Sequence, residues 1–110
     1  MQIIDYATSG GKNIIMDYLK SLPQKEKAEG YRIRQLIRED GIDAFDALNT
    51  RQLRGKLWEI KFYSNRIMYV LYDKGTVYFL HACKKQKNKA EKFELDKAIR
   101  RANDYGLKID

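Results

Sequence analysis

The feature that most constrains the fold is a run of three apolar segments between residues 56 and 83, separated by two short polar turns. The first segment, KLWEIKFY, alternates apolar and polar side chains, and the next two, RIMYVLY and TVYFLHAC, are rich in β-branched and aromatic residues. These patterns favour strands. Ser64-Asn65 and Asp73-Lys74-Gly75 leave room only for tight turns. The run therefore predicts an antiparallel meander, and the apolar character of its last strand predicts a place in the middle of the sheet.

Helical periodicity lies on both sides of this meander. Apolar residues recur at helical spacing over residues 12–22 and 23–40, with Pro23 dividing the two segments, and again over residues 89–105. Residues 1–7 predict a first strand, and residues 50–53 a short additional one. The order is strand, helical hairpin, three- to four-stranded antiparallel meander and C-terminal helix. It predicts an α+β domain with its helices packed on one face of a curved sheet.

Size and composition limit the organisation of the chain and its location. A chain of 110 residues with 44% apolar content predicts one domain over residues 1–110. The single cysteine, Cys83, cannot form an internal disulfide. The sequence has no apolar run of the roughly 20 residues that span a bilayer, and its first residues do not resemble a signal peptide. We therefore expect a cytoplasmic protein.

Positive charge is concentrated in the second half of the chain. The net charge is +7 and the pI is about 9.5. Residues 84–101 hold eight basic and three acidic side chains, which gives 8 − 3 = +5. Such a balance suits a polyanion, although it also occurs in proteins that are simply soluble and basic. Residues 52–101 are interpreted as a segment that contacts the phosphate backbone of a nucleic acid, with RNA preferred.

Few other kinds of chemistry fit the sequence. One cysteine and one histidine cannot build a structural zinc site, and no cofactor-binding motif is present. Grouped lysines and arginines can nevertheless cleave RNA, because they stabilise the charge that grows on the phosphate when the 2′-OH attacks it. This reaction needs no metal, and it is restricted to RNA because DNA lacks the 2′-OH.

Several motifs over residues 48–105 resemble the RelE/ParE toxin superfamily, and its phage-derived HigB-like branch in particular. They are the strand L-x-G-x-L-W-E-I-(R/K), the arginine-led strand R-I-x-Y-V, a strand ending in Lys-Lys, and a final helix with A-x-x-R-A-x-x-Y. The resemblance implies a type II toxin–antitoxin toxin of RelE-like fold. It implies an endoribonuclease, or mRNA interferase, that cleaves mRNA on the ribosome and inhibits translation. The implied partner is an antitoxin, expected to be a HigA-like helix-turn-helix protein.

The resemblance also implies a set of catalytic residues. Lys61 matches a basic residue that approaches the 2′-OH or the phosphate, and Arg66 matches the arginine that stabilises the scissile phosphate. Lys85, with Lys84 beside it, matches a basic residue that contacts phosphate or serves as an acid. Glu59 stands where some relatives carry a lysine, and it is interpreted here as holding Lys61 in position.

Other side chains in the same region have two interpretations. His81 is a candidate general acid, or else a hydrogen-bonded, partly buried histidine. Trp58 is interpreted as a core residue, and Cys83 as a small buried one. Phe93 and Tyr105 are the candidates for an aromatic residue that stacks on a base. The further cations expected to contact RNA are Arg54, Lys56, Lys87, Lys89 and Arg100.

Two alternatives to the endoribonuclease remain open at this point. A ParE-like inhibitor of DNA gyrase would share the fold and would need no catalytic cations. A non-catalytic, phage-derived nucleic-acid-binding domain would bind RNA without cleaving it. Cations on the strands as well as on the last helix favour the endoribonuclease.

Overall fold

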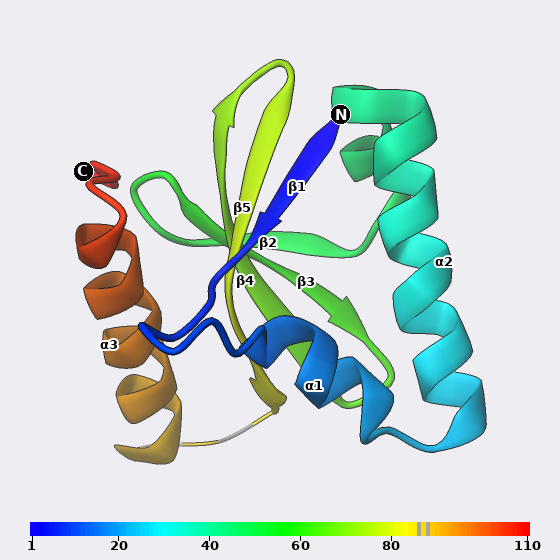
Figure 1. The fold of residues 1–110 in the computed structure, drawn as a ribbon, viewed down its shortest axis with the longest axis horizontal. Coiled ribbons are helices and arrows are strands. Elements are labelled where there is room, and N and C mark those ends of the chain that lie inside the picture. The colour runs from blue at the N-terminus through cyan, green and yellow to red at the C-terminus, as the bar shows by residue number, and fades with distance from the viewer. Residues whose placement is uncertain (86, 88) are drawn as a thin grey trace.

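The structure is a computed structural model that describes residues 1–85, 87 and 89–110, and the side chains of all these except residues 89 and 90. The elements follow the predicted order (Figure 1). They are β1 (Gln2–Asp5), α1 (Ile14–Lys20), α2 (Gln24–Asp40), the 3-10 helix η1 (Gly41–Ala47), β2 (Thr50–Arg54), β3 (Leu57–Phe62), β4 (Asn65–Asp73), β5 (Thr76–Lys84) and α3 (Lys89–Asp104). Within the described residues, no helix is both long enough and apolar enough to cross a membrane.

The five strands form one mixed sheet in the order β1-β5-β4-β3-β2. Strands β2 to β5 form the predicted antiparallel meander, and β5 lies inside the sheet as expected. β1 pairs in parallel with β5, so that Ile3 lies opposite Val77. Residues 6–75, which include the helical hairpin and β2 to β4, separate the two strands and far exceed the dozen or so residues that a parallel connection requires.

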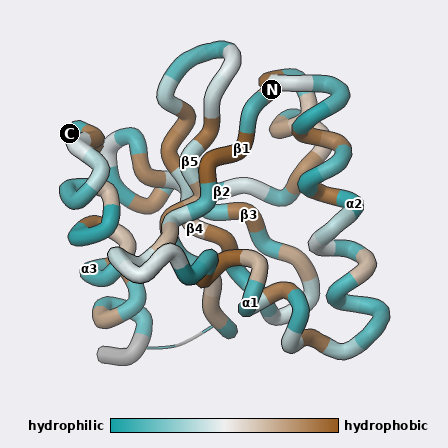
Figure 2. The backbone as a smooth tube through the Cα atoms, viewed as in Figure 1, coloured by the Kyte–Doolittle hydropathy of each residue, from teal (hydrophilic) through white to brown (hydrophobic). Residues whose placement is uncertain are grey.

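The prediction that the helices pack on one face of the sheet is wrong. On β4, Ile67 and Tyr69 contact the cluster beneath α1 and α2, whereas Met68 and Val70 contact the cluster beneath α3. Successive strand residues point to opposite faces, so α3 covers the face opposite the other two helices (Figure 1). The physical reason lies in β4 itself: it is apolar on both faces, and each face has to be shielded from water. Figure 2 shows hydrophobic residues along the strands of the sheet, which lie between the helices on its two sides.

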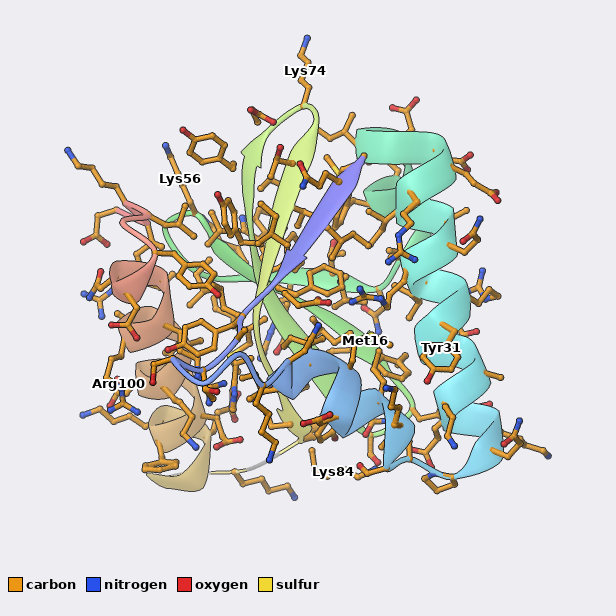
Figure 3. The ribbon with its side chains drawn as sticks, in the orientation of Figure 1. Met16, Tyr31, Lys56, Lys74, Lys84 and Arg100 are labelled. Atoms are coloured by element: carbon orange, nitrogen blue, oxygen red, sulfur yellow. The ribbon has the colours of Figure 1, made fainter. Side chains whose placement is uncertain are left out.

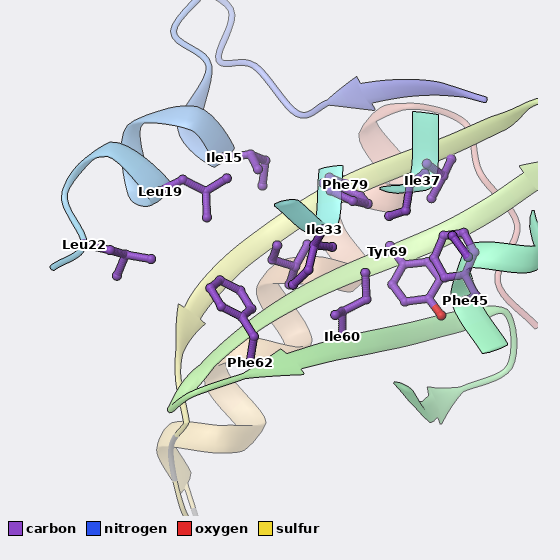
Figure 4. Packing of buried hydrophobic residues seen from close by; sticks show 13 residues of the cluster. Ile15, Leu19, Leu22, Ile33, Ile37, Phe45, Ile60, Phe62, Tyr69 and Phe79 are labelled. Atoms are coloured by element: carbon purple, nitrogen blue, oxygen red, sulfur yellow. The ribbon is translucent and has the colours of Figure 1, made fainter. Parts of the chain in front are cut away.

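The larger apolar cluster joins α1, α2 and η1 to the sheet (Figure 4). Gly30 lies in the middle of α2 and is buried. A Cβ atom at this position would lie 2.8 Å from Leu19 Cδ2 and 3.5 Å from Phe62 Cζ. A glycine normally weakens a helix, but here it allows α1 and the sheet to approach α2 closely.

The smaller cluster packs α3 on the other face. Ala98 and Ala102 are fully buried against Leu57, Met68 and Leu80. The two alanines let the helix lie close to the strands.

Trp58 departs from the expectation of a core residue. It pairs with Gln52 on the edge strand β2 and remains 37% exposed. The buried residues on its face of β3 are Ile60 and Phe62, which lie farther along the strand.

Candidate functional site

The strand register brings four predicted catalytic cations to one end of the sheet. Lys61 on β3 lies opposite Arg66 on β4. Lys84 on β5 lies opposite Asn65, and the Lys85 backbone N–H donates to the carbonyl of Ser64 at 2.8 Å. Cα atoms that face each other across antiparallel strands are only about 4.5–5.5 Å apart. We call the group Lys61, Arg66, Lys84 and Lys85 the basic strand end.

The four cations of the basic strand end differ in how accessible they are. Lys85 is exposed, Lys61 is partly buried beside a surface cavity, and Arg66 is only 2% exposed. Lys84 forms an ion pair with Glu26 at 3.2 Å. Lys61 and Lys85 have no carboxylate within ion-pair distance among the described side chains. These two lysines are therefore the members of the basic strand end that a phosphate can contact without breaking an ion pair.

A hydrogen-bond network fixes Lys84 to both N-terminal helices. Glu26 Oε1 on α2 accepts from Asn65 Nδ2 at 2.7 Å as well as from Lys84 Nζ. Tyr18 on α1 donates its hydroxyl to Asn65 Oδ1 at 2.7 Å. The hydrogen bonds from Asn65 and Lys84 lower the pKa of Glu26. Sequence reasoning missed Glu26, because nothing near it in the chain indicates its partners.

Arg66 belongs to a second network, which we call the four-charge cluster (Arg51, Glu59, Arg66 and Glu91). Glu59 is fully buried; its two oxygens accept from Arg66 Nε and, at 3.0 Å, from Arg51 Nε. Glu91 on α3 lies 3.1 Å from Arg66 Nη2 and 3.4 Å from Arg51 Nη2. The interpretation that Glu59 holds Lys61 is therefore wrong: this carboxylate pairs with arginines on both sides of it.

His81 is 5% exposed and lies between α3 and the sheet. Arg101 Nη1 lies 2.7 Å from His81 Nδ1, and Glu94 Oε2 lies 3.1 Å from His81 Nε2. A guanidinium can only donate, so Nδ1 accepts and Nε2 carries the proton that is donated to Glu94. Burial lowers the pKa of His81, outweighing the opposite effect of Glu94. These contacts agree with a hydrogen-bonded, buried histidine and leave neither ring nitrogen free for a substrate.

His81, Cys83 and Glu94 are also the group whose chemistry most resembles a metal site. Their ligand atoms lie within 4.8 Å of one another. Nε2 of His81 donates its proton to Glu94, so two of the three side chains are hydrogen-bonded to each other. Burial, followed by a hydrogen bond to Glu94, raises the pKa of Cys83 to about 12, so its thiol is neutral. All three side chains are thus engaged with one another, and they fasten α3 to β5.

The other predicted RNA contacts do not all lie beside the basic strand end. They are Arg54, Lys56, Lys87, Lys89 and Arg100. Figure 3 shows Lys56 and Arg100 on the α3 side of the molecule, well away from Lys84. Lys87 is exposed and follows β5 closely in the chain. The side chain of Lys89 lies outside the described residues.

The two candidates for base stacking also differ. Phe93 on α3 is exposed, and Lys97 Nζ lies 5.0 Å from the centre of its ring. Tyr105 stacks on Tyr6 at 5.0 Å, and its hydroxyl oxygen accepts from the Ala7 backbone N–H. Phe93 is exposed enough to stack on a base, whereas the ring of Tyr105 already packs on Tyr6.

The fold and this site define a small α+β domain whose sheet presents basic side chains at one end. A profile of the phage-derived Gp49-like proteins (DUF891) matches residues 17–103, well over half of the chain. The protein belongs to this family. The match includes the basic strand end, the four-charge cluster and His81. No curated protein matches the chain.

Proposed function

We propose that this protein is the toxin of a type II toxin–antitoxin system and that it cleaves mRNA on the ribosome as a metal-independent endoribonuclease. The observation that carries the proposal is the register of β3, β4 and β5, which gathers Lys61, Arg66, Lys84 and Lys85 at one end of the sheet. Membership of a phage-derived family and the resemblance to the HigB-like branch support it.

Cleavage of RNA by attack of the 2′-OH involves three events at the site. The 2′-oxygen forms a bond to the neighbouring phosphorus while its proton passes to a base. The bond from phosphorus to the 5′-oxygen breaks, and that oxygen gains a proton. Negative charge grows on the non-bridging oxygens, where nearby cations stabilise it. Lys61 and Lys85 are accessible enough to take this role, and Lys85 is the candidate donor to the leaving oxygen.

His81 has no part in this proposal. Its two ring nitrogens are engaged with Arg101 and Glu94, and the residue is only 5% exposed. A general acid must reach the substrate within hydrogen-bond distance. We therefore assign His81 a structural role.

The test compares lysines of equal charge at different places. We expect induced expression of the protein to arrest translation and the double variant Lys61→Ala/Lys85→Ala to relieve the arrest. Lys74→Ala is the matched control, because Lys74 lies on the turn at the opposite end of the molecule from Lys84 (Figure 3). Full toxicity of the double variant would show that the site is wrongly placed. Arg66→Ala is a poor test, because it would also break the four-charge cluster.

One observation favours a second candidate function, non-catalytic RNA binding. Arg66, Lys84 and His81 are all engaged with carboxylates inside the protein. A binding domain would show salt-sensitive RNA binding and no cleavage on translating ribosomes. An SOS response with intact mRNA would indicate neither function, but inhibition of DNA gyrase.

We further propose that a helix-turn-helix antitoxin holds the toxin inactive. An acidic segment of that partner would cover the basic strand end and neutralise it. The adjacent gene is the place to look for it, and co-expression of that gene product should restore growth. Lack of any such neighbour would count against a toxin.

A further inference from the structure

A small cavity opens over the four-charge cluster. It measures about 240 Å³ and lies between β2, β4 and α3. Its polar lining comes from Arg51, Gln52, Arg66 and Glu91, and its apolar lining from Leu53 and Leu95. This cavity is smaller than the roughly 300–1,000 Å³ usual for drug-sized ligands, so its size suits a phosphate group with part of its ribose.

The two carboxylates of the cluster are not equivalent. Glu59 is fully buried and bonds both arginines through separate oxygens. Glu91 has a side chain that is 38% exposed, and it reaches both arginines through the single oxygen Oε1. Glu91 can therefore rotate into water without moving the backbone, whereas Glu59 cannot.

The present contacts also leave Arg66 incompletely bonded. Its Nη1 is buried and has no hydrogen-bond partner among the described side chains. Buried charged donors without an acceptor are rare in folded proteins. A phosphodiester offers two non-bridging oxygens and can accept from Arg51 and Arg66 through separate oxygens, whereas Glu91 pairs with both arginines through Oε1 alone.

We propose that Arg51 and Arg66 form a binding site for a backbone phosphate of RNA, and that Glu91 is an internal occupant that this phosphate displaces. The identity of the ligand rests on the proposed function, whereas the anion site rests on the cluster itself. Glu91 thereby lowers the affinity of the resting protein for its substrate and sets a threshold for binding. Arg51, which the sequence interpretation did not assign to the site, becomes a substrate contact.

The test measures binding of two probes to matched variants. Glu91→Gln removes the occupant's charge, and Asp96→Asn removes the same charge at an exposed position on the same helix. Binding of inorganic phosphate is followed by NMR at the backbone amides of residues 51 and 66. Binding of a labelled single-stranded oligouridylate is followed by fluorescence anisotropy. Circular dichroism confirms that each variant is folded.

If Glu91 occupies the site about nine-tenths of the time, its removal raises affinity about tenfold. We expect the affinity for both probes to rise by about tenfold in Glu91→Gln and by much less in Asp96→Asn. We expect no rise in the double variant Glu91→Gln/Arg51→Gln. Equal phosphate affinity in Glu91→Gln and Asp96→Asn would overturn the inference. If the protein binds the oligouridylate but Glu91→Gln does not raise the affinity, the proposed function stands and this site is refuted. A phosphate gain without RNA binding by any variant would establish the anion site and refute the RNA function.

Discussion

Replacing Glu59 by glutamine should destabilise the protein more than its single-atom change suggests. Glu59 is 0% exposed and Arg66 is 2% exposed, so the pair is almost completely buried. Removing one partner of a buried ion pair costs about 3–5 kcal/mol, because it leaves an uncompensated charge. Glu91 would still pair with Arg66, which places the expected loss near the lower end, at about 3 kcal/mol.

The neighbouring carboxylate provides the comparison. Glu91→Gln removes a partly exposed partner while Glu59 still neutralises Arg66, so its cost should be about 0–1 kcal/mol. For a domain of this size, 1 kcal/mol corresponds to about 4–5 °C in Tm. We therefore expect Tm to fall by roughly 12–15 °C for Glu59→Gln and by less than about 5 °C for Glu91→Gln.

Thermal and urea unfolding followed by circular dichroism will measure both losses of stability. A double variant, Glu59→Gln/Arg66→Met, should be less destabilised than the sum of its single changes, since it removes the unpaired charge as well. If Glu59→Gln loses no more stability than Glu91→Gln, the cluster is not held together by its buried pair.

Two further predictions concern the core. Gly30→Ala would place a methyl group 2.8 Å from Leu19 Cδ2. We expect the free energy of unfolding, measured in urea, to fall by about 1–2 kcal/mol, after allowing for a gain of about 1 kcal/mol from the higher helix propensity of alanine. A stabilised variant would show that α1 can move aside freely. The pKa of His81 is lowered from 6.5 in the folded state. The stability that the neutral histidine contributes is therefore complete above pH 6.5 and is lost as the pH falls through the folded pKa. The loss is at most about 1.4 kcal/mol per pH unit. His81→Gln keeps one acceptor and one donor without titrating, and it should lose less stability between pH 7.5 and pH 5.5 than the wild type; equal losses would contradict a buried neutral histidine.

The order of elements could be predicted from the sequence because each one carries a local signal. The alternation around Ile60 located β3, the turn at residues 73–75 separated β4 from β5, and Pro23 divided the two N-terminal helices. The parallel pairing of β1 with β5 has no such signal, since either edge of the meander could accept a strand. The position of α3 does have a local signal in the sequence. β4 has consecutive apolar residues, Ile67 to Val70, and these need cover on both faces of the sheet.

The candidate site was predictable in position but not in its internal pairing. Strand register follows from the turns, so the meander alone places Lys61 beside Arg66. The partners that decide accessibility come from helices distant in sequence: Glu26 reaches Lys84 from α2, and Glu91 reaches Arg66 from α3. No spacing rule links such residues, because tertiary packing alone brings them together.

The chemical form of the RNA ends tests the central proposal most directly. The purified protein is added to ribosomes translating a defined mRNA, and the new ends are identified by mass spectrometry. Attack by the 2′-OH predicts a 2′,3′-cyclic phosphate on one fragment and a 5′-hydroxyl on the other, with both reduced in Lys61→Ala/Lys85→Ala and unchanged in Lys74→Ala. A 3′-hydroxyl with a 5′-phosphate, or intact mRNA with a folded protein bound, would contradict the account.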